Sequence, residues 1–194
     1  MSNDAARVKL PVDEIHYIQD SILYKFSDGT RLTDRYREML DVGTADVPPI
    51  GCVYHAGRWW ALDNRRLFLF KKLHSHEQLD DVDVLWRCAD MNDPNDRTAQ
   101  EYKNKYRTRN GGTSVAVRGN PNLNQELDKL TVDWKRSKDE QFSTIVSSCL
   151  RTTSYDDEER DDYDDRGNDC CWDDVARRNL KTRKSNKMFL NYLA

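Results

Sequence analysis

The clearest pattern of hydrophobic and polar positions lies in residues 47–73, VPPIGCVYHAGRWWALDNRRLFLFKKL. Two runs rich in β-branched and aromatic residues flank the turn sequence HAGR, and this arrangement predicts a β-hairpin over 47–62. Apolar residues then recur at helical spacing, which predicts a helix from Arg65 to about Leu73. A strand, a turn and a helix in direct succession are typical of a small α+β domain.

Weaker patterns predict further elements on both sides of this segment. Short apolar runs that alternate with polar residues indicate strands, and apolar residues three and four positions apart indicate helices. The expected elements are a strand within 7–18, a short helical segment over 22–26, a helix over 33–42 ended by Gly43, a strand over 83–88, a helical turn over 102–106, a strand over 113–118 and an amphipathic helix over 122–136. Together they predict an α+β fold with a small mixed sheet and helices.

The composition limits how much of the chain can fold. Charged residues make up 34% of the 194 positions and hydrophobic residues 37%, whereas globular domains average about 25% charged residues. The run of acidic residues over 155–165 repels itself and is expected to stay extended. We therefore expect a disordered N-terminus over 1–7, a folded domain with a C-terminal extension over 8–138, and a largely disordered, acidic C-terminal tail over 139–194.

The same sequence favours an intracellular protein, in the cytoplasm or the nucleus. No run of apolar residues is long enough for a membrane span, and the N-terminal residues lack the apolar segment of a secretory signal. The five cysteines form no C-x-x-C pair, and His74 and His76 have no third ligand at a suitable spacing. We thus expect no membrane partner and no metal site built by the protein, and the oligomeric state is left open.

The junction between the hairpin and the following helix is the candidate site. It delivers free backbone amides, the positive end of a helix dipole and two guanidinium groups to one place. Arg65 and Arg66 suit phosphate, because a guanidinium group can bind two phosphate oxygens at once. A simpler interpretation is that Asp63 caps the helix and that the two arginines pair with Asp63 and other nearby carboxylates.

The ordered set P-P-I, V and G-R-W-W-A-L-D-N-R-R-L resembles the ParB/sulfiredoxin superfamily over roughly residues 8–90. The resemblance implies a ParB/sulfiredoxin-like fold in which the turn before the helix binds nucleotide phosphates. Members bind and hydrolyse CTP, use ATP to rescue an oxidised cysteine, or phosphorylate free serine, and some are described as nucleases. Arg65 and Arg66 match the Arg-Arg pair of the ParB type.

Three positions depart from particular members of that superfamily. Asp63 takes the place of the family's glycine. Asn64 stands where sulfiredoxins have their catalytic cysteine, which excludes sulfiredoxin chemistry. Leu62 stands where the serine kinase has an acidic residue. These departures argue against sulfiredoxin chemistry and weaken the interpretation as a serine kinase.

The leading hypothesis is a protein that binds ATP or CTP and either hydrolyses it or transfers its phosphoryl group. Asp63 or Asp20 would hold Mg²⁺ or orient the attacking group, because positioning and electrostatics dominate phosphoryl transfer. The residues expected to contact the phosphates are Asn64, Arg65, Arg66 and Ser21.

Two other functions remain open. The first is a nucleic-acid-binding or nuclease module that uses the same turn, with a second basic strip that alternates with tyrosines and consists of Lys103, Lys105, Arg107 and Arg109. The net charge of −3 does not favour it. The second is a non-catalytic interaction protein of the same fold whose pocket has degenerated.

Overall fold

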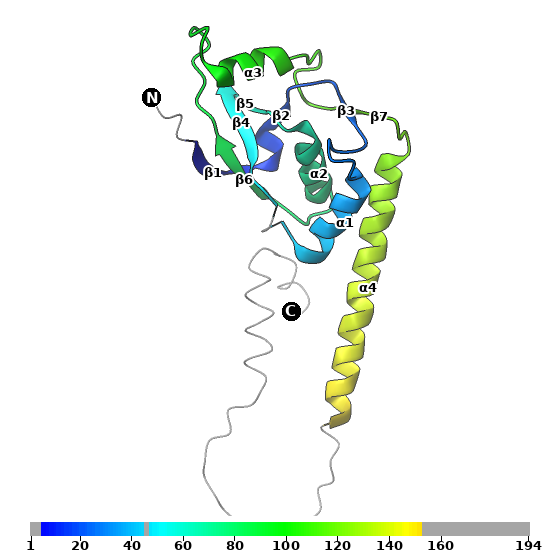
Figure 1. The fold of residues 1–194 in the computed structure, drawn as a ribbon. Coiled ribbons are helices and arrows are strands. Elements are labelled where there is room, and N and C mark those ends of the chain that lie inside the picture. The colour runs from blue at the N-terminus through cyan, green and yellow to red at the C-terminus, as the bar shows by residue number, and fades with distance from the viewer. Residues whose placement is uncertain (1–4, 45–46, 153–194) are drawn as a thin grey trace, which may run out of the picture. The chain divides into compact units, whose positions relative to one another are not determined.

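The computed structural model describes residues 5–44 and 47–152 (Figure 1). The chain divides into two units, Met1–Ser137 and Lys138–Ala194. The first unit carries every strand and site residue discussed below. The described elements are β1 (Ala6–Pro11), a 3-10 turn (Val12–Glu14), β2 (Ile15–Tyr17), β3 (Ser21–Leu23), α1 (Leu32–Val42), β4 (Ile50–His55), β5 (Arg58–Ala61), α2 (Asn64–Ser75), β6 (Asp81–Trp86), α3 (Arg97–Lys105), β7 (Ala116–Arg118) and α4 (Leu123–Thr152).

The fold is α+β with a mixed sheet, as the sequence predicts. The main sheet has five strands in the order β1-β6-β4-β5-β2. Strand β4 pairs antiparallel with β5 and parallel with β6, while β1 is antiparallel to β6 and β2 is parallel to β5. The β4–β5 hairpin confirms the prediction over 47–62, with Cys52 opposite Ala61 and His55 opposite Arg58.

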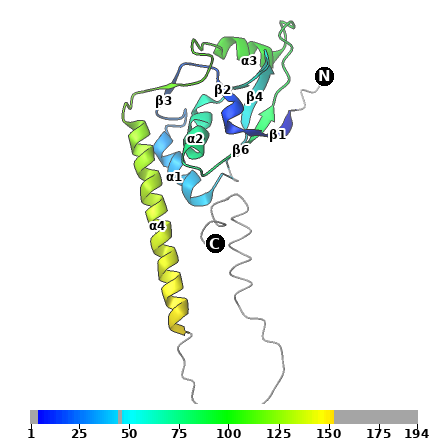
Figure 2. The ribbon, with the colours of Figure 1, turned by 180° about the vertical axis from the view of Figure 1, so that it is seen from behind.

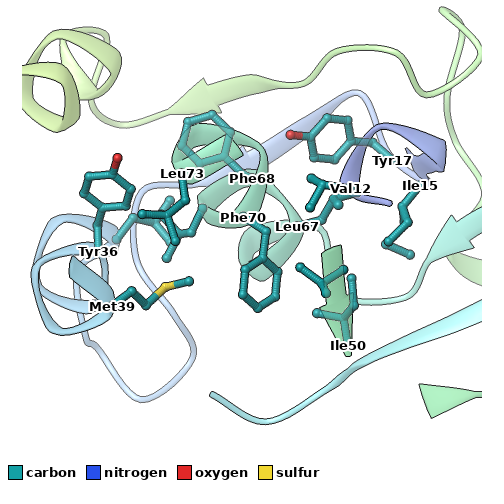
Figure 3. Packing of buried hydrophobic residues seen from close by; sticks show 14 of the residues in the cluster. Val12, Ile15, Tyr17, Tyr36, Met39, Ile50, Leu67, Phe68, Phe70 and Leu73 are labelled. Carbon is teal, nitrogen blue, oxygen red and sulfur yellow. The ribbon is translucent and has the colours of Figure 1, made fainter. Parts of the chain in front are cut away.

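Helix α2 fills the centre of the core. Leu67, Leu69 and Leu73 are at most 2% exposed, and they pack with Ile50 of β4 and with residues of α1 and the N-terminal segment (Figure 3). Burying an aliphatic side chain of this size contributes about 1.5–3 kcal/mol. Core packing of α2 therefore fixes where its N-terminus, the candidate site, begins.

The opposite face of the sheet carries a smaller cluster under α3. Side chains alternate along a strand, so Trp59 and Trp60 of β5 point to different faces. Trp60 is 3% exposed and packs with Val53, Ile18 and Tyr102 of α3. Trp59 packs on the main core instead. The two tryptophans therefore pack on opposite faces of the sheet, and Trp60 anchors α3 to it.

Helix α1 and the beginning of α4 close the main core. Helix α1 confirms the helix predicted over 33–42, and Gly43 ends it with a left-handed φ of 89°. The first turns of α4 lie beside α1 in both views (Figures 1 and 2). A buried hydrogen bond joins the Tyr36 hydroxyl to Thr131 Oγ1 at 2.8 Å. The predicted amphipathic helix over 122–136 is therefore a part of the core.

The structure differs from several of the sequence predictions. The segment expected to be helical over 22–26 contains strand β3, because Ser21–Leu23 pair in parallel with Ala116–Arg118, a partner distant in the chain. Helix α3 is longer than the turn expected over 102–106, since Asp96 caps it by accepting a hydrogen bond from the Ala99 amide at 2.9 Å. Short apolar runs do not by themselves distinguish strand from helix.

The limits of the domain also differ from those expected. The first strand begins at Ala6 rather than at residue 8. Helix α4 has 30 residues and runs to Thr152, into the segment assigned to the tail, because no glycine or proline interrupts 123–152. The rest of the expected tail, 153–194, and residues 1–4 lie outside the described residues. Of the helices in the described part of the chain, none has both the length and the apolar character that crossing a bilayer requires.

Asp128 ties the start of α4 to the end of α2, and this contact predicts a pH-dependent stability. The Asp128 carboxylate lies 2.6 Å from Lys72 Nζ and 2.7 Å from His76 Nε2. Burial raises the pKa of Asp128, but the hydrogen bonds and charges of Lys72 and His76 outweigh this effect and lower it overall. A lowered pKa in the folded state stabilises the fold above the unfolded pKa, about 4, and the stabilisation is lost as the pH falls through the folded pKa.

We expect Asp128→Asn to lower the free energy of unfolding at pH 7 by less than about 1 kcal/mol, because the Asp128 side chain is 47% exposed and solvent screens the pair. At a second, acidic pH below the lowered pKa of Asp128, the wild type and the variant should be equally stable. Urea unfolding at the two pH values measures this difference. Asp133→Asn is the control, since Asp133 has a looser ion pair of 3.8 Å with Arg136. An equal loss at both pH values would contradict the assignment.

Candidate functional site

The candidate site forms where β5 passes into α2. The first hydrogen bond of α2 runs from the Leu67 amide to the Asp63 carbonyl at 3.1 Å. The amides of Asn64, Arg65 and Arg66 precede that bond and have no carbonyl one turn earlier in the helix. They lie at the positive end of the helix dipole, the position at which helices bind anions. The backbone geometry expected from the sequence is present.

A two-lobed cleft lies at this end of α2. The first lobe has a volume of about 300 Å³ and the second about 320 Å³. The lobes adjoin at four residues that line both, which we call the waist: Leu62, Asp63, Arg65 and Lys105. The first lobe is completed by Asn64 and by Gln19, Ser21, Ile22, Leu23 and Arg118. The second lobe is completed by Gly51, Arg87 and Glu101.

Arg65 is the guanidinium group of the waist. Its Nη1 donates a hydrogen bond to the Lys25 carbonyl at 2.9 Å, and its charged end lies 5.4 Å from the centre of the Phe26 ring. A guanidinium group has five N–H donors, so this bond leaves donors for a ligand. The contacts with Lys25 and Phe26 hold the group in place before any ligand binds.

Arg66 and Asp63 form an ion pair, with 3.1 Å between Arg66 Nη1 and Asp63 Oδ2. Asp63 occupies the N-cap position of α2, but its side chain makes no capping hydrogen bond. The expectation of a capping carboxylate is therefore wrong, because the carboxylate is directed to Arg66 instead. Pairing of an arginine with Asp63, the simpler interpretation of the sequence, is confirmed for Arg66.

Asn64 supports the site from within the protein. Asn64 is buried, with 6% of the residue exposed. Its Oδ1 accepts a hydrogen bond from the Ile18 amide at 3.0 Å, and its Nδ2 donates to Gln19 Oε1 at 3.4 Å. The side chain is thus committed to the segment between β2 and β3, and the backbone amide is the group of Asn64 at the helix N-terminus.

Ser21 and Asp20, the other two residues expected at the site, have different contacts. Ser21 lines the first lobe. The Asp20 carboxylate accepts hydrogen bonds from the Arg109 amide at 2.9 and 3.1 Å, and Asp20 is not among the described residues that line the cleft. Asp20 and Asp63 are therefore not brought together as a pair of catalytic carboxylates, since Asp20 holds the loop that carries Arg109.

The basic strip of the sequence divides among three places. Lys105 lies at the waist, where its Nζ donates to the Leu62 carbonyl at 3.0 Å and to Glu101 Oε1 at 2.7 Å. Lys103 donates instead to the Met91 carbonyl at 2.8 Å. Arg107 and Arg109 are exposed, and their amides donate to the Ile18 carbonyl and the Asp20 carboxylate. Of the four, Lys105 joins the phosphate-binding candidates.

Sequence reasoning missed Arg87, Glu101, Arg118 and Gln19 as residues of the cleft. Glu101 binds Arg87 and Lys105 at once, with Oε2 and Oε1 each 2.7 Å from its partner. Burial raises the pKa of Glu101, but the hydrogen bonds and charges of Lys105 and Arg87 lower it overall, so Glu101 is ionised near neutral pH. The spacing of Glu101 and Lys105, four residues apart on a helix, is the one signal that the sequence contains.

The described residues of the cleft offer few ligands for the Mg²⁺ that the sequence analysis considered. Among the residues that the structure describes, no three His, Cys, Asp or Glu residues come together as a metal-binding group. The cleft offers the carboxylates of Asp63 and Glu101, each already paired with a basic residue. This set fits the usual binding of Mg²⁺, in which one or two carboxylates assist phosphate oxygens and water.

Comparisons with known proteins add no family to this geometry: no protein-family model matches the chain, and no curated protein matches it. The functional argument therefore rests on the cleft and on the residues that line it. The positive charge of the cleft comes from four side chains: Arg65, Lys105, Arg87 and Arg118. The backbone amides that can bind an anion come from the start of α2.

Proposed function

We propose that the chain binds a nucleoside triphosphate, ATP or CTP, in the cleft, and that it hydrolyses the nucleotide or transfers its phosphoryl group. The observation that carries the proposal is the waist, where Arg65 and Lys105 flank the N-terminus of α2. A charge-assisted hydrogen bond to phosphate is about twice as strong as a neutral one. Each lobe is near the lower end of the range of ligand pockets, roughly 300–1,000 Å³.

The proposal includes a domain of the ParB/sulfiredoxin-like type. Its support is the order of elements from β1 to β6, with helix α1, the β4–β5 hairpin and helix α2 between them. The proposed phosphate-binding turn lies between β5 and α2, at the place that the resemblance implies. The four-residue turn of the sequence, Asp63 to Arg66, contributes its backbone amides and Arg65.

Asp63 is the carboxylate proposed to act in the chemical step. It lines both lobes, and its pairing with Arg66 orients it. In phosphoryl transfer such a group positions the attacking hydroxyl or water, while cations stabilise the transferred group. Asp20 is less suited to this role because its carboxylate holds the Arg109 amide.

Arg65→Ala is expected to weaken nucleotide binding at least about tenfold, because it removes the guanidinium donor at the waist. Thermal unfolding of the full chain with Mg²⁺ and ATP, CTP, GTP or UTP measures binding, since ligand at 100 times its Kd adds about 2.7 kcal/mol of stability. Arg65→Lys should be intermediate, as it keeps the charge without the planar fork. Arg37→Ala is the control, an exposed arginine on α1 away from the cleft residues.

The outcomes separate the candidate functions. No shift with any nucleotide in the wild type, or equal shifts in Arg65→Ala and the control, would overturn the proposal. A shift without turnover of the nucleotide would leave a binding protein rather than an enzyme.

Nucleic-acid binding is the second candidate, favoured by the exposed Arg107 and Arg109 beside Tyr106, which is 42% exposed. Its signature is an affinity for oligonucleotides that falls steeply with salt.

A further inference from the structure

The two lobes of the cleft differ in chemistry. Beyond the shared waist, the first lobe offers two apolar side chains, Ile22 and Leu23, and four polar groups, of which one is a cation: Gln19, Ser21, Asn64 and Arg118. The second lobe offers Gly51 and the charged groups of Arg87 and Glu101. Apolar surface with a few hydrogen-bonding groups suits a base and a sugar. A lobe that adds only charged side chains and a glycine suits a small, strongly charged group.

The cations of the second lobe are held in fixed positions. Glu101 receives a hydrogen bond from Arg87 at 2.7 Å and another from Lys105 at 2.7 Å. Lys105 also donates to the Leu62 carbonyl at 3.0 Å, at the end of β5. Helix α3 therefore joins the end of β6 to the start of α2, and through Glu101 it holds its own Lys105 and Arg87 beside the same lobe. Cations that are placed in advance lose less conformational entropy when a ligand binds.

Resting on the proposed function, we infer that the second lobe is the subsite for the terminal phosphates of the nucleotide, and that the first lobe holds the base and sugar. The phosphate next to the sugar then lies at the waist, against the amides of α2 and Arg65. Lys105 and Arg87 bind the phosphates beyond it. Helix α3, which lies outside the segment that resembles known nucleotide-binding domains, thereby selects triphosphates over monophosphates.

The carboxylates of the second lobe do not oppose this arrangement. Both oxygens of Glu101 already accept hydrogen bonds from cations, and Asp63 is paired with Arg66. Arg65, Arg66, Arg87 and Lys105 outnumber these two carboxylates, so the charge around the lobe is positive. Terminal phosphates carry most of the charge of a triphosphate, and they gain most from this surplus.

Gly51 provides a steric test of the second lobe. A Cβ atom built on Gly51 would lie 3.7 Å from Arg87 Cδ and 3.8 Å from Leu62 Cδ1, which is ordinary van der Waals contact. The backbone therefore accepts a side chain at this position, and a longer one would occupy the lobe that Gly51 lines. Gly51→Leu should fill the second lobe while the first lobe stays open.

The experiment compares the affinities of the full chain for a nucleoside triphosphate, the matching monophosphate and inorganic tripolyphosphate by calorimetry. The wild type should bind the triphosphate at least about tenfold more tightly than the monophosphate, since the added phosphates make charge-assisted contacts. Gly51→Leu should abolish this preference and the binding of tripolyphosphate, with monophosphate affinity changed less than about threefold. Lys105→Met should weaken the triphosphate and tripolyphosphate more than the monophosphate, because Lys105 lines both lobes. Lys105→Arg should restore the preference.

Two further variants act as controls. Leu23→Ser, in an exposed residue of the first lobe, should weaken both nucleotides and leave tripolyphosphate binding unchanged. Lys103→Met should change neither, because Lys103 bonds outside the cleft. A purely structural role of Lys105 would weaken all ligands equally, and that result would overturn the inference. Equal affinity of the wild type for triphosphate and monophosphate would overturn it while nucleotide binding stands, whereas no binding of any nucleotide would overturn both proposals.

Discussion

Gly112→Ala is expected to lower the free energy of unfolding by about 3–4 kcal/mol, the largest effect of any substitution considered for this chain. Gly112 has a left-handed φ of +73°, and a Cβ atom there would lie 2.3 Å from the Tyr17 carbonyl oxygen. It would also lie 2.9 Å from the Trp60 ring. Neither neighbour can move freely, because Tyr17 is in strand β2 and Trp60 is buried.

The backbone of Gly112 holds a loop against the sheet. Its carbonyl accepts a hydrogen bond from the Tyr17 amide at 2.9 Å, and its amide donates to Thr108 Oγ1 at 2.9 Å. The same loop provides the Arg109 amide that Asp20 binds. A side chain at Gly112 would therefore displace 107–112 from β2 and free the segment that contains Gln19 and Ser21, which line the first lobe.

Gly111→Ala is the matched control. Gly111 has a similar left-handed φ of +66°, but the atom nearest to an added Cβ is Nη1 of the Arg58 side chain, at 3.2 Å. A guanidinium group can swing away, so only the backbone cost of about 1 kcal/mol remains. Urea unfolding of both variants measures the difference. Equal losses would show that the close approach of Gly112 to Tyr17 is not what stabilises the loop.

The elements that sequence reasoning predicted are those specified by nearby residues. Helix α1 has its apolar spacing and Gly43 within one segment, and the β4–β5 hairpin has its turn between its own strands. Strand β3 could not be predicted in this way, because its partner β7 lies far along the chain. The same apolar run, Ile22 to Phe26, is compatible with a helix until that partner is known.

The residues of the cleft also fall into those that nearby sequence specifies and those that depend on distant parts of the chain. The turn at Arg65 was predictable, since a strand, two arginines and a helix follow one another in the sequence. Arg118 and Arg87 reach the cleft only through the packing of β7 and β6, and their sequence neighbours give no indication of it. The sequence groups Lys105 with the basic residues Lys103, Arg107 and Arg109. It does not reveal that α3 turns Lys105 toward the Leu62 carbonyl.

Asn64→Ala is expected to lower the free energy of unfolding by about 3 kcal/mol, the second largest effect. The substitution leaves the Ile18 amide without the Oδ1 that accepts its hydrogen bond at 3.0 Å. An unsatisfied buried donor costs about 1–3 kcal/mol, and the space left at a residue that is 6% exposed adds to this cost. Urea unfolding measures the loss, and hydrogen exchange of the Ile18 amide should accelerate with it.

Asn104→Ala is the control for residue type, an asparagine that also lies in a helix. Asn104 is exposed on α3, and alanine is a better helix former, so its stability should stay the same or rise slightly. An Asn64→Ala variant as stable as the wild type would contradict the assigned bond to Ile18.

The same variant separates two roles for Asn64. The sequence suggested that Asn64 contacts phosphate, whereas its side chain is bound to Ile18 and Gln19. Alanine keeps the backbone amide at the start of α2, so nucleotide affinity measured well below the unfolding temperature should fall less than about threefold, while stability falls substantially. Lost affinity in a variant of unchanged stability would instead place the Asn64 side chain on the phosphates. Because stability and nucleotide affinity are separate quantities, this one variant decides whether the Asn64 side chain supports the proposed phosphate site or contacts phosphate there.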